Sequence, residues 1–354
     1  MKNQIVEKDL EEIFKSHKNK KYLKKKNIII TGASGFIGFY LSKYFIKYFN
    51  ELKLSKLYIT CINSDKLNKT FKNNQKKKIF IKKFDVNSGN IKAFKSKFDI
   101  IIHAASIASP TFYRKFPIET MQANVNGLWN LLEQIKNKKT KILFFSSSEI
   151  YGNPDLKNIP TKETYYGNVN SAGPRSCYDE SKRFCETICY VYSKKYKKIT
   201  PIIIRPFNNF GPGLSTSDKR LPADLANQVL NRKNITLFSS GKPKRSFCYI
   251  SDAVTGYINA ISYNKFEIFN IGNDKEISVK KFAEYFRDGS KKILNHLPKI
   301  KFKLSKDKNY LTDNPDRRCP DLSKSKKLLG YSCKVNTKQG IENYIKFLNY
   351  ENKY

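Results

Sequence analysis

The sequence is poor in the residues that build metal sites and disulfide frameworks. It has only three histidines among 354 residues, and its seven cysteines include no C-x-x-C pair. A structural zinc site needs clustered cysteine and histidine ligands, and a disulfide framework uses an even number of cysteines. We therefore expect no metal site, and we expect the cysteines to be reduced and structural.

Long hydrophobic runs are also missing. The longest apolar runs, such as Ile28–Ile30 and Ile100–Ile102, have the length of strands, whereas a membrane-spanning helix needs roughly 20 apolar residues. The stretch from Met1 to Lys26 is charged throughout and contains no apolar segment of signal-peptide length. We therefore expect a cytoplasmic protein that has no membrane partner.

Acidic residues are scarce, since 30 Asp and Glu face 68 Lys and Arg, which gives a net charge of +38. Such an excess can indicate nucleic-acid binding when it is clustered. Here the lysines are spread along the whole chain, beside many Asn, Ile, Tyr and Phe, as AT-rich codons would produce. We interpret them as a solvated coat and expect no nucleic-acid partner, although the positive field would help to attract an anionic substrate.

What the sequence does contain is an alternation of strand and helix patterns. A short buried strand at Asn27–Thr31 precedes a glycine turn and an apolar-periodic helix at about Phe36–Phe49. Helical patterns separate most of the later strands, whereas the polar residues 63–78 are interpreted as a loop. This order predicts an α/β fold, a Rossmann-type doubly wound parallel sheet with a smaller C-terminal substrate-binding lobe. The later strands are expected at Leu57–Ile62, Ile79–Phe84, Ile100–His103, Lys141–Ser146 and Ile199–Arg205.

The glycine turn has the spacing G-x-x-G-x-x-G, formed by Gly32, Gly35 and Gly38 around Phe36 and Ile37. The first glycine permits a tight turn, the second lets the backbone approach a pyrophosphate, and the third lets the helix pack on the strand. The helix N-terminus offers free N–H groups to phosphate. These five residues are therefore predicted to bind a dinucleotide.

The residue that would read the ribose of this dinucleotide is less clear. No acid stands at the end of the second strand, where Asp65 or Asn63 could serve and Lys66 could instead favour a 2′-phosphate. NAD and NADP therefore both remain open at this point. Asp85 and Val86, which follow a later strand, are predicted to contact the adenine side.

The chemistry is predicted to lie in two segments. Tyr178 and Lys182 are four residues apart in a helix-forming run and so share one helix face. A tyrosine titrates near pH ~10, but a nearby ammonium and a bound nicotinamide cation both favour the phenolate, which makes Tyr178 a proton shuttle. Ser147, Ser148 and Glu149 follow a core strand, at the sheet edge where α/β folds bind ligands.

Together these motifs resemble those of the extended short-chain dehydrogenase/reductases, the NAD-dependent epimerase/dehydratase family, and among them the UDP-glucuronate decarboxylases. The resemblance runs from about Lys26 to Tyr344. It implies bound NAD and a nucleotide-sugar substrate, a UDP-sugar. The matching stretches are 105–110 with Tyr113, 148–152, 173–183, 205–212, 245–252 and 317–321.

The resemblance also implies domains and an assembly. Residues 26–205 would form the NAD-binding Rossmann domain, to which residues 246–275 return. The preceding residues 1–25 are interpreted from their own composition as a basic, polar N-terminal leader that is helical around Val6–Lys15. Residues 206–354 would form mainly the nucleotide-sugar-binding lobe. Since this family usually dimerises through a helical bundle that includes the Tyr-Lys helix, we expect a homodimer.

By the same resemblance, Tyr178 would be the catalytic base, Lys182 its partner, and Glu149 the catalytic glutamate, and Ser147 would hydrogen-bond the sugar 4-hydroxyl. Tyr178 and Lys182 would also contact the cofactor.

The remaining implied residues bind the substrate. Tyr113, Ser148 and Arg318 would hold the carboxylate of a glucuronate, and Asn208 and Arg245 would hold the diphosphate. If the sugar carried no acid, we expect that Arg318 would have no partner.

The sequence also departs from the decarboxylases. Ile107 replaces a proline, Ser147 a threonine, Gly213 an arginine, and Phe238 and Ser239 a Tyr-Gly pair. The last two departures leave the base and the sugar open. A 4,6-dehydratase or 4-epimerase is therefore the alternative, although dehydratases carry Asp-Glu where this chain has Ser-Glu. A non-catalytic nucleotide-binding protein is the distant alternative.

Overall fold

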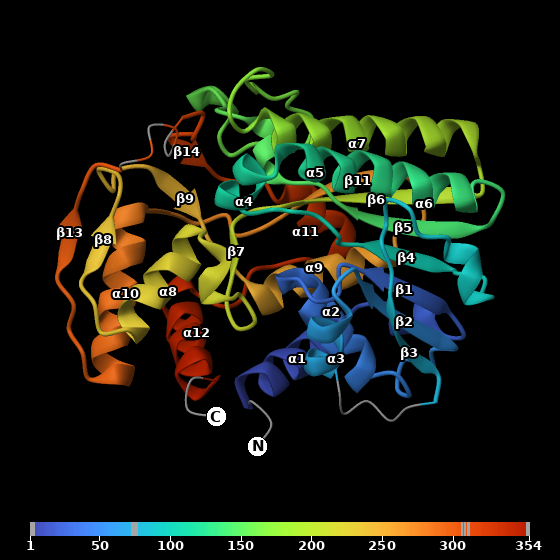
Figure 1. Cartoon of the computed structure of the whole chain (residues 1–354), viewed down its shortest axis with the longest axis horizontal. Helices are drawn as coiled ribbons and strands as arrows, with labels where there is room; N and C mark the ends of the chain where they lie inside the picture. The colour runs from blue at the N-terminus through green and yellow to red at the C-terminus, as the bar shows by residue number, and fades with distance from the viewer. Residues whose placement is uncertain (1–3, 72–76, 306, 308, 310–311, 352–354) are drawn as a thin grey trace.

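A parallel sheet of seven strands forms the centre of the molecule in the computed structural model, which describes residues 4–71, 77–305, 307, 309 and 312–351. The strand order is β11-β6-β5-β4-β1-β2-β3 (Figure 1). The order reverses between β1 and β4, which is the place where doubly wound sheets bind ligands. The strands are β1 Asn27–Thr31, β2 Lys56–Cys61, β3 Ile79–Lys83, β4 Ile100–His103, β5 Thr140–Phe145, β6 Ile199–Pro206 and β11 Glu267–Ile271.

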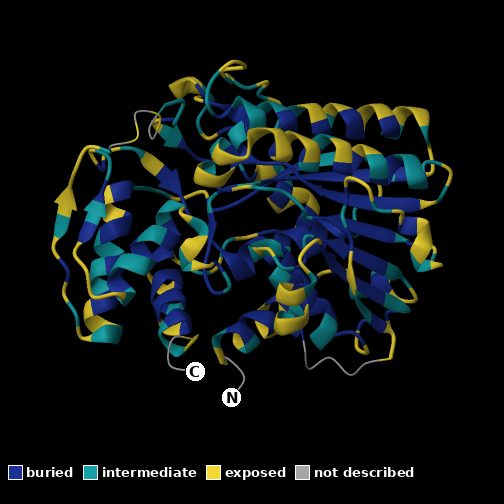
Figure 2. Cartoon of the chain, in the orientation of Figure 1, coloured by how far each residue is buried: buried dark blue, intermediate teal, exposed yellow. Residues whose placement is uncertain are grey.

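Helices cover both faces of this sheet, so its central strands are buried on both sides (Figure 2). Ile29 and Ile101 face the helices α6 and α7, while Ile28 and Ile30 face α2 and α9. Continuous apolar runs, rather than alternating ones, are what a strand covered on both faces requires. The covering helices are α2 Phe36–Lys47, α6 Gly127–Ile135, α7 Ser176–Lys195 and α9 Ile250–Ile261. The doubly wound fold predicted from the sequence is confirmed.

A smaller group of elements lies beside the carboxyl ends of the strands (Figure 1). It is built around the pair α10 and α12, and it includes a three-stranded sheet in the order β12-β9-β14. This sheet brings Arg318 in β14 next to Arg245 in β9. The elements are α8 Leu221–Leu230, β8 Ile235–Leu237, β9 Lys244–Ser246, β12 Glu276–Ser278, α10 Val279–Leu294, β13 Ile300–Phe302, β14 Arg317–Arg318 and α12 Thr337–Glu351.

Several shorter elements pack against these two parts. They are α4 Pro110–Lys115, α5 Pro117–Met121, β7 Asn209–Phe210, β10 Cys248–Tyr249 and α11 Ser323–Leu329.

The interpretation of residues 63–78 as a loop was wrong for residues 64–71, which form helix α3 (Ser64–Phe71). Leu67 and Phe71, four residues apart, are buried on one face, and the Asn63 side chain accepts a hydrogen bond from Lys66 N at 2.8 Å. Two apolar residues at helical spacing and a capping side chain were enough to form a helix in this polar stretch. Residues 72–76 lie outside the described residues.

The N-terminal leader contains the helix that its pattern predicted around Val6–Lys15, and this helix is packed into the core. Helix α1 (Gln4–Ser16) buries Val6, Leu10 and Ile13. The buried Asp9 carboxylate accepts hydrogen bonds from Tyr40 Oη at 2.8 Å and from Tyr249 Oη at 2.9 Å. Burial raises the pKa of Asp9 to about 7. Helix α1 therefore joins α2 to the region around α9.

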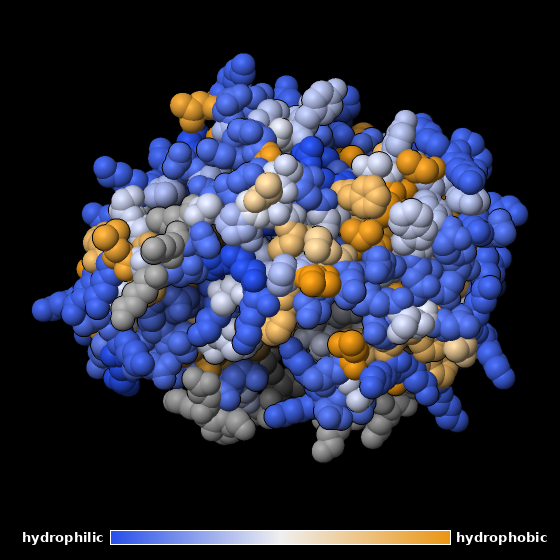
Figure 3. All heavy atoms as spheres, turned by 45° about the horizontal axis from the view of Figure 1, so that its top comes forward, coloured by the Kyte–Doolittle hydropathy of each residue, from blue (hydrophilic) through white to orange (hydrophobic). Residues whose placement is uncertain are grey.

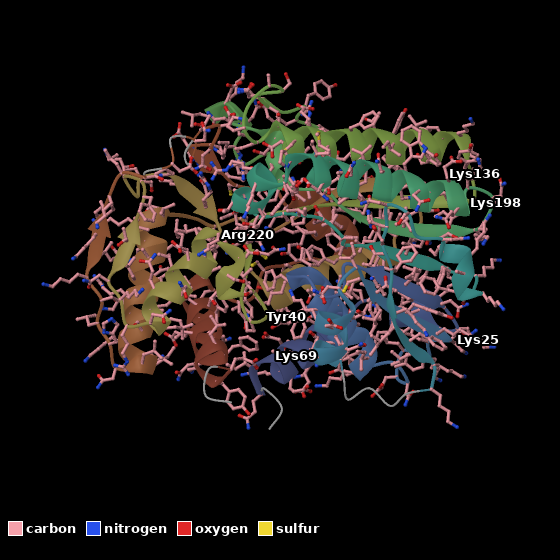
Figure 4. All side chains as sticks on the ribbon, viewed as in Figure 1. Lys25, Tyr40, Lys69, Lys136, Lys198 and Arg220 are labelled. Carbon is pink, nitrogen blue, oxygen red and sulfur yellow. The ribbon has the colours of Figure 1, made fainter. Side chains whose placement is uncertain are left out.

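The surface agrees with a dispersed coat of charge. Hydrophilic residues cover most of the face in Figure 3, and Lys25, Lys136 and Lys198 lie at the outer edge of the molecule in Figure 4. Across the described ranges, no helix is both long and apolar enough to span a bilayer.

Candidate active site

A cavity of about 680 Å³ collects most of the residues that the sequence singled out. It extends from the glycine turn, past the ends of β4 and β5, to the smaller group of elements. Gly32, Asp85 and Val86 do not line it. The predicted residues that do are Gly35, Phe36, Ile37, Gly38, Tyr113, Ser147, Ser148, Glu149, Tyr178, Lys182, Asn208, Arg245 and Arg318.

The glycine turn fits a pyrophosphate. Gly32 has a φ of +69°, and a Cβ there would lie 2.6 Å from the backbone of Ala104. A Cβ on Gly38 would lie 2.2 Å from Gly32 O, so these two glycines are required by the turn itself. A Cβ on Gly35 would meet only Gly32 O, at 3.2 Å. Gly35 begins α2 without a side-chain cap, which leaves the first N–H groups of the helix for a phosphate.

Replacing Gly35 with valine is expected to weaken NAD binding about tenfold while the protein stays folded, because a crowded contact costs about 1–3 kcal/mol. The measurement is the Kd for NAD, together with a thermal melt. Gly38→Ala is the comparison, and it should destabilise the protein as a whole because its Cβ would strike backbone. Unchanged NAD affinity in the valine variant would show that the turn is only structural.

The predicted adenine contacts lie next to the cavity rather than on it. The Asp85 carboxylate accepts a hydrogen bond from Asn87 N at 2.9 Å, and Val86 is buried against the helix that carries Gly127. Their contact with the cofactor stays a prediction.

Tyr178 and Lys182 lie side by side on α7, both buried. Lys182 Nζ lies 5.8 Å from the centroid of the Tyr178 ring and donates a hydrogen bond to Phe145 O at 2.8 Å. Burial raises the pKa of Tyr178 to about 12, although a hydrogen bond with Ser147 opposes the rise. Burial also lowers the pKa of Lys182 to about 8. The phenol is therefore protonated at neutral pH until a further cation stabilises the phenolate.

Ser147 connects this pair to the glutamate. Its hydroxyl accepts a hydrogen bond from Glu149 N at 3.2 Å and so caps the 3₁₀ turn Ser148–Tyr151 that follows β5. The same side chain hydrogen-bonds Tyr178. One hydroxyl group thus fixes the relative positions of the proposed base and of the acidic turn.

Glu149 is held by two guanidinium groups. Arg318 uses both of its terminal nitrogens, with Nη2 at 2.8 Å from Oε2 and Nη1 on Oε1, and Arg175 Nη2 also donates to Oε2. Burial raises the pKa of Glu149, but the charges of Arg175 and Arg318 outweigh it and bring the pKa to about 2. Glu149 is therefore an anion and not a proton donor.

This pairing corrects one expectation. Arg318 would have a partner even without an acidic substrate, because its two terminal nitrogens already bind the carboxylate of Glu149. The two residues are 169 positions apart in the chain, and only the fold brings them together.

Four buried polar atoms around Glu149 have no hydrogen-bond partner among the described residues. One is the acceptor Asp179 Oδ1, and the other three are the donors Tyr113 Oη, Arg175 Nε and Arg318 Nε, whose side chains line the cavity. The Tyr113 ring stacks on Tyr178 with centroids 4.9 Å apart. Because an unpaired buried donor is costly, the three donors indicate a site for a ligand with acceptor oxygens, next to the proposed base.

Arg245 lines the cavity, but its guanidinium group is already used. It donates to Lys244 O at 2.8 Å, to Asp316 O at 3.1 Å, to Asn314 Oδ1 at 3.2 Å and to Pro315 O. These bonds hold the loop that leads to Arg318. Asn208 Nδ2 likewise donates to Ser246 O at 3.0 Å. The predicted diphosphate contacts of both residues stay a prediction.

Sequence reasoning assigned no role to Arg175 or Arg220. Arg175 stands just before the Tyr-Lys helix, so its position was a usable signal. Arg220 follows an irregular stretch without periodicity. It lines the cavity, and its Nη2 donates to Asp218 Oδ2 at 2.9 Å. Figure 4 shows Arg220 near the centre of the molecule, above Tyr40.

Comparisons with known proteins agree with this geometry. UDP-glucuronic acid decarboxylase 1 of Xenopus tropicalis is 33% identical over 328 residues, which cover 92% of this chain and 73% of that protein. UDP-glucuronic acid decarboxylase 3 of Arabidopsis thaliana is 35% identical over 316 residues, which cover 89% and 86%.

Among solved structures, UDP-glucuronic acid 4-epimerase from Bacillus cereus, in complex with UDP-glucuronic acid and NAD, has a TM-score of 0.74 at 24% identity and covers 93% of this chain and 100% of that one. At that identity the likeness shows the fold. The pattern of the NAD dependent epimerase/dehydratase family matches residues 28–272. The chain therefore belongs to the NAD-dependent epimerase/dehydratase family.

Proposed function

We propose that this protein is a UDP-glucuronate decarboxylase that forms UDP-xylose and CO₂ with NAD⁺ as a recycled cofactor. The observation that carries the proposal is the group of unpartnered donors, Tyr113 Oη, Arg175 Nε and Arg318 Nε, beside Tyr178. A carboxylate on C5 of the sugar would accept from Tyr113 Oη and Arg318 Nε, with Arg175 close by, while the 4-hydroxyl meets Ser147 and Tyr178. The decarboxylase relatives, which match over most of the chain, support the same substrate.

The residues suit each step. Tyr178 accepts the proton of the 4-hydroxyl, and Ser147 fixes the direction of that transfer. The chemistry supplied by bound NAD⁺ is reversible hydride exchange at C4, so the net reaction needs no added oxidant. A 4-keto uronate is a β-keto acid, which loses CO₂ because the ketone stabilises the enolate. The enolate is then protonated at C5 by water, since Glu149 is ionised and carries no proton to give.

The acidic turn disfavours 4,6-dehydration. That reaction needs an acid to protonate the departing 6-hydroxyl. Ser148 is buried in the position next to Glu149 where dehydratases carry an aspartate, and a serine hydroxyl is too weak an acid for this role. Glu149 itself is held as an anion by Arg175 and Arg318.

The decisive experiment incubates the NAD-loaded protein with a panel of nucleotide-sugars and records CO₂ and product mass. UDP-glucuronate labelled with ¹³C at C6 should yield labelled CO₂ and a UDP-pentose. A product of unchanged mass but inverted C4 would identify a 4-epimerase instead. If no nucleotide-uronate releases CO₂, the proposed function is wrong.

We also propose a division into domains and a location in the cell. Residues 26–205 with 246–275 would hold the cofactor, and residues 206–354 would mainly hold the nucleotide-sugar, which the position of the cavity supports. The seven cysteines are all free thiols, which supports a reducing compartment, the cytoplasm.

We also propose a homodimer formed through the face of α5, α6 and α7. Ile118, Met121, Trp129, Phe184 and Val191 are exposed large hydrophobic residues on this segment of the chain. A concentration of such side chains on paired helices is typical of an interface.

The expected result for the wild type is a dimer at micromolar concentration, by light scattering after size-exclusion chromatography. Replacing Trp129 and Phe184 together with glutamate should give a folded monomer, because each charge would have to be buried in the interface. Leu304→Glu is the control, since this exposed leucine lies after β13 in the smaller group of elements, away from the α5, α6 and α7 face. A monomeric wild type would contradict the proposal.

A further inference from the structure

Glu149 receives its two cations from different parts of the fold. Arg175 directly precedes α7, the helix that carries Tyr178, whereas Arg318 lies in β14 of the three-stranded sheet. The side chains of Arg175, Arg318 and Glu149 are only 8%, 4% and 19% exposed, so solvent screens their charges little.

Only one of the two arginines, Arg318, would also bind the carboxylate of the substrate. Both terminal nitrogens of Arg318 are bound to Glu149, and only Nε remains free. Under the proposed function, on which this inference rests, a second carboxylate enters the cavity beside Arg318. A guanidinium group has five N–H donors, so Arg318 can keep its two bonds to Glu149 and offer Nε to a second carboxylate. The single positive charge of Arg318 is then divided between two carboxylates when the substrate binds.

Arg175 is anchored to α7, so it can stay bound to Glu149 when a substrate carboxylate binds to Arg318. Its carbonyl oxygen accepts the N–H groups of Tyr178 at 3.0 Å and of Asp179 at 3.1 Å, which ties it to the first turn of α7. Its Nε lies 3.8 Å from Asp179 Oδ2, and its guanidinium group lies 5.9 Å from the centroid of the Tyr113 ring.

We propose that Arg175 is a positioning residue that keeps Glu149 ionised and fixed in place while Arg318 binds the carboxylate of the substrate. Glu149 thereby remains a constant anion throughout turnover, and the two acidic groups do not share a single cation.

Among the groups around Glu149, Arg175 is the one that can keep Glu149 ionised when Arg318 also binds the substrate. Burial and the charge of Glu149 raise the pKa of Asp179 to about 8, so Asp179 is mostly protonated at neutral pH and does not neutralise Arg175. Arg245 contributes charge from a distance but is bound to the 314–316 loop. The titratable and charged groups that face Glu149 are Tyr113 on α4, Arg175, Tyr178 and Asp179 at α7, Arg245 on β9 and Arg318 on β14.

The test is the pH profile of kcat for CO₂ release. In the wild type, Glu149 should stay ionised at every pH from 5 to 9. Its protonation should therefore cause no fall in kcat on the acidic side of the pH profile. In Arg175→Gln, Glu149 would stand beside the substrate carboxylate with no cation of its own, and two such groups raise each other's pKa. The kcat should then fall as the pH falls, by about 100-fold or more near pH 5.5 and much less near pH 9, with a smaller change in KM.

Three variants make the result specific. Arg175→Lys loses the guanidinium geometry, so it should be slower than the wild type. Because it keeps the positive charge, its kcat should not fall at low pH. In a Glu149→Gln background, Arg175→Gln should cost less than about threefold, because the anion it serves is gone. Arg287→Gln, which breaks an exposed pair with Asp288 on α10, is the control and should match the wild type.

The outcomes separate the two proposals. If the wild type releases CO₂ but Arg175→Gln keeps a flat profile, or loses as much in the Glu149→Gln background, only the role of Arg175 is overturned. If the wild type releases no CO₂, the proposed function fails, and the inference fails with it. If Arg175→Gln does not retain NAD or a normal melt, Arg175→Lys decides, and a fall in its kcat at low pH overturns the inference.

Discussion

Replacing Tyr178 with phenylalanine should lower kcat for CO₂ release by about 10²–10⁴-fold while leaving bound NAD in place. In the proposed mechanism the phenolate oxygen of Tyr178 accepts the proton of the sugar, and phenylalanine lacks this oxygen but keeps the ring that stacks on Tyr113 at 4.9 Å. The fold of the site should therefore survive, because the ring that fills the space remains. The measurement is steady-state CO₂ release, with NAD content determined by absorbance and mass.

The matched control is Tyr190→Phe on the same helix, since Tyr190 is half exposed and lies outside the cavity. It should retain normal turnover. A near-wild-type rate in Tyr178→Phe would remove the proposed base. Loss of NAD from that variant would instead give Tyr178 a structural role in cofactor binding.

Replacing Arg318 with alanine should lower CO₂ release about 10²-fold or more and abolish the preference for UDP-glucuronate over UDP-glucose. Removing one partner of a buried ion pair costs about 3–5 kcal/mol, and here the loss affects both Glu149 and the substrate carboxylate. The Kd for NAD should change little, because the glycine turn that holds the cofactor contains none of these groups. Competition titrations of the two sugars against both proteins measure the preference.

The neighbour Arg317 provides the control for this variant. Arg317 pairs with Glu276 at 2.5 Å and its side chain is 35% exposed, so Arg317→Ala should change CO₂ release by less than about twofold. If the wild type binds UDP-glucose better than UDP-glucuronate, the decarboxylase assignment is wrong. The family would be unaffected, and Glu149 would then need another role.

The candidate site residues whose placement in the fold was predicted correctly are those encoded within a few consecutive residues. The glycines of the turn are adjacent to a strand of continuous isoleucines, so their place in the fold follows from local pattern. Tyr178 and Lys182 share a helix face by spacing alone, and both line the cavity. Local spacing fixes local geometry, which is why these residues needed no knowledge of the tertiary fold.

The parts that were missed depend on contacts between distant segments. The pair of Arg318 with Glu149 joins residues 169 positions apart, and no pattern in either segment indicates the other. Helix α3 was hidden because six of its eight residues are polar, and only Leu67 and Phe71 are buried. Partner choice among charged groups is decided by the tertiary fold, so the sequence alone named Arg318 but did not indicate its pairing with Glu149.

Helix α1 also has a consequence for synthesis on the ribosome. Its Asp9 bonds Tyr249, 240 residues later, and the Asn259 side chain, 241 residues after Lys18, accepts the N–H of Lys18. At about 5–20 residues per second, the partners of this helix emerge tens of seconds after the helix itself. During that interval α1 can pack on α2 but not on α9. Helix α1 thus completes its docking only late in synthesis, and part of its apolar face stays exposed on the nascent chain until α9 is made.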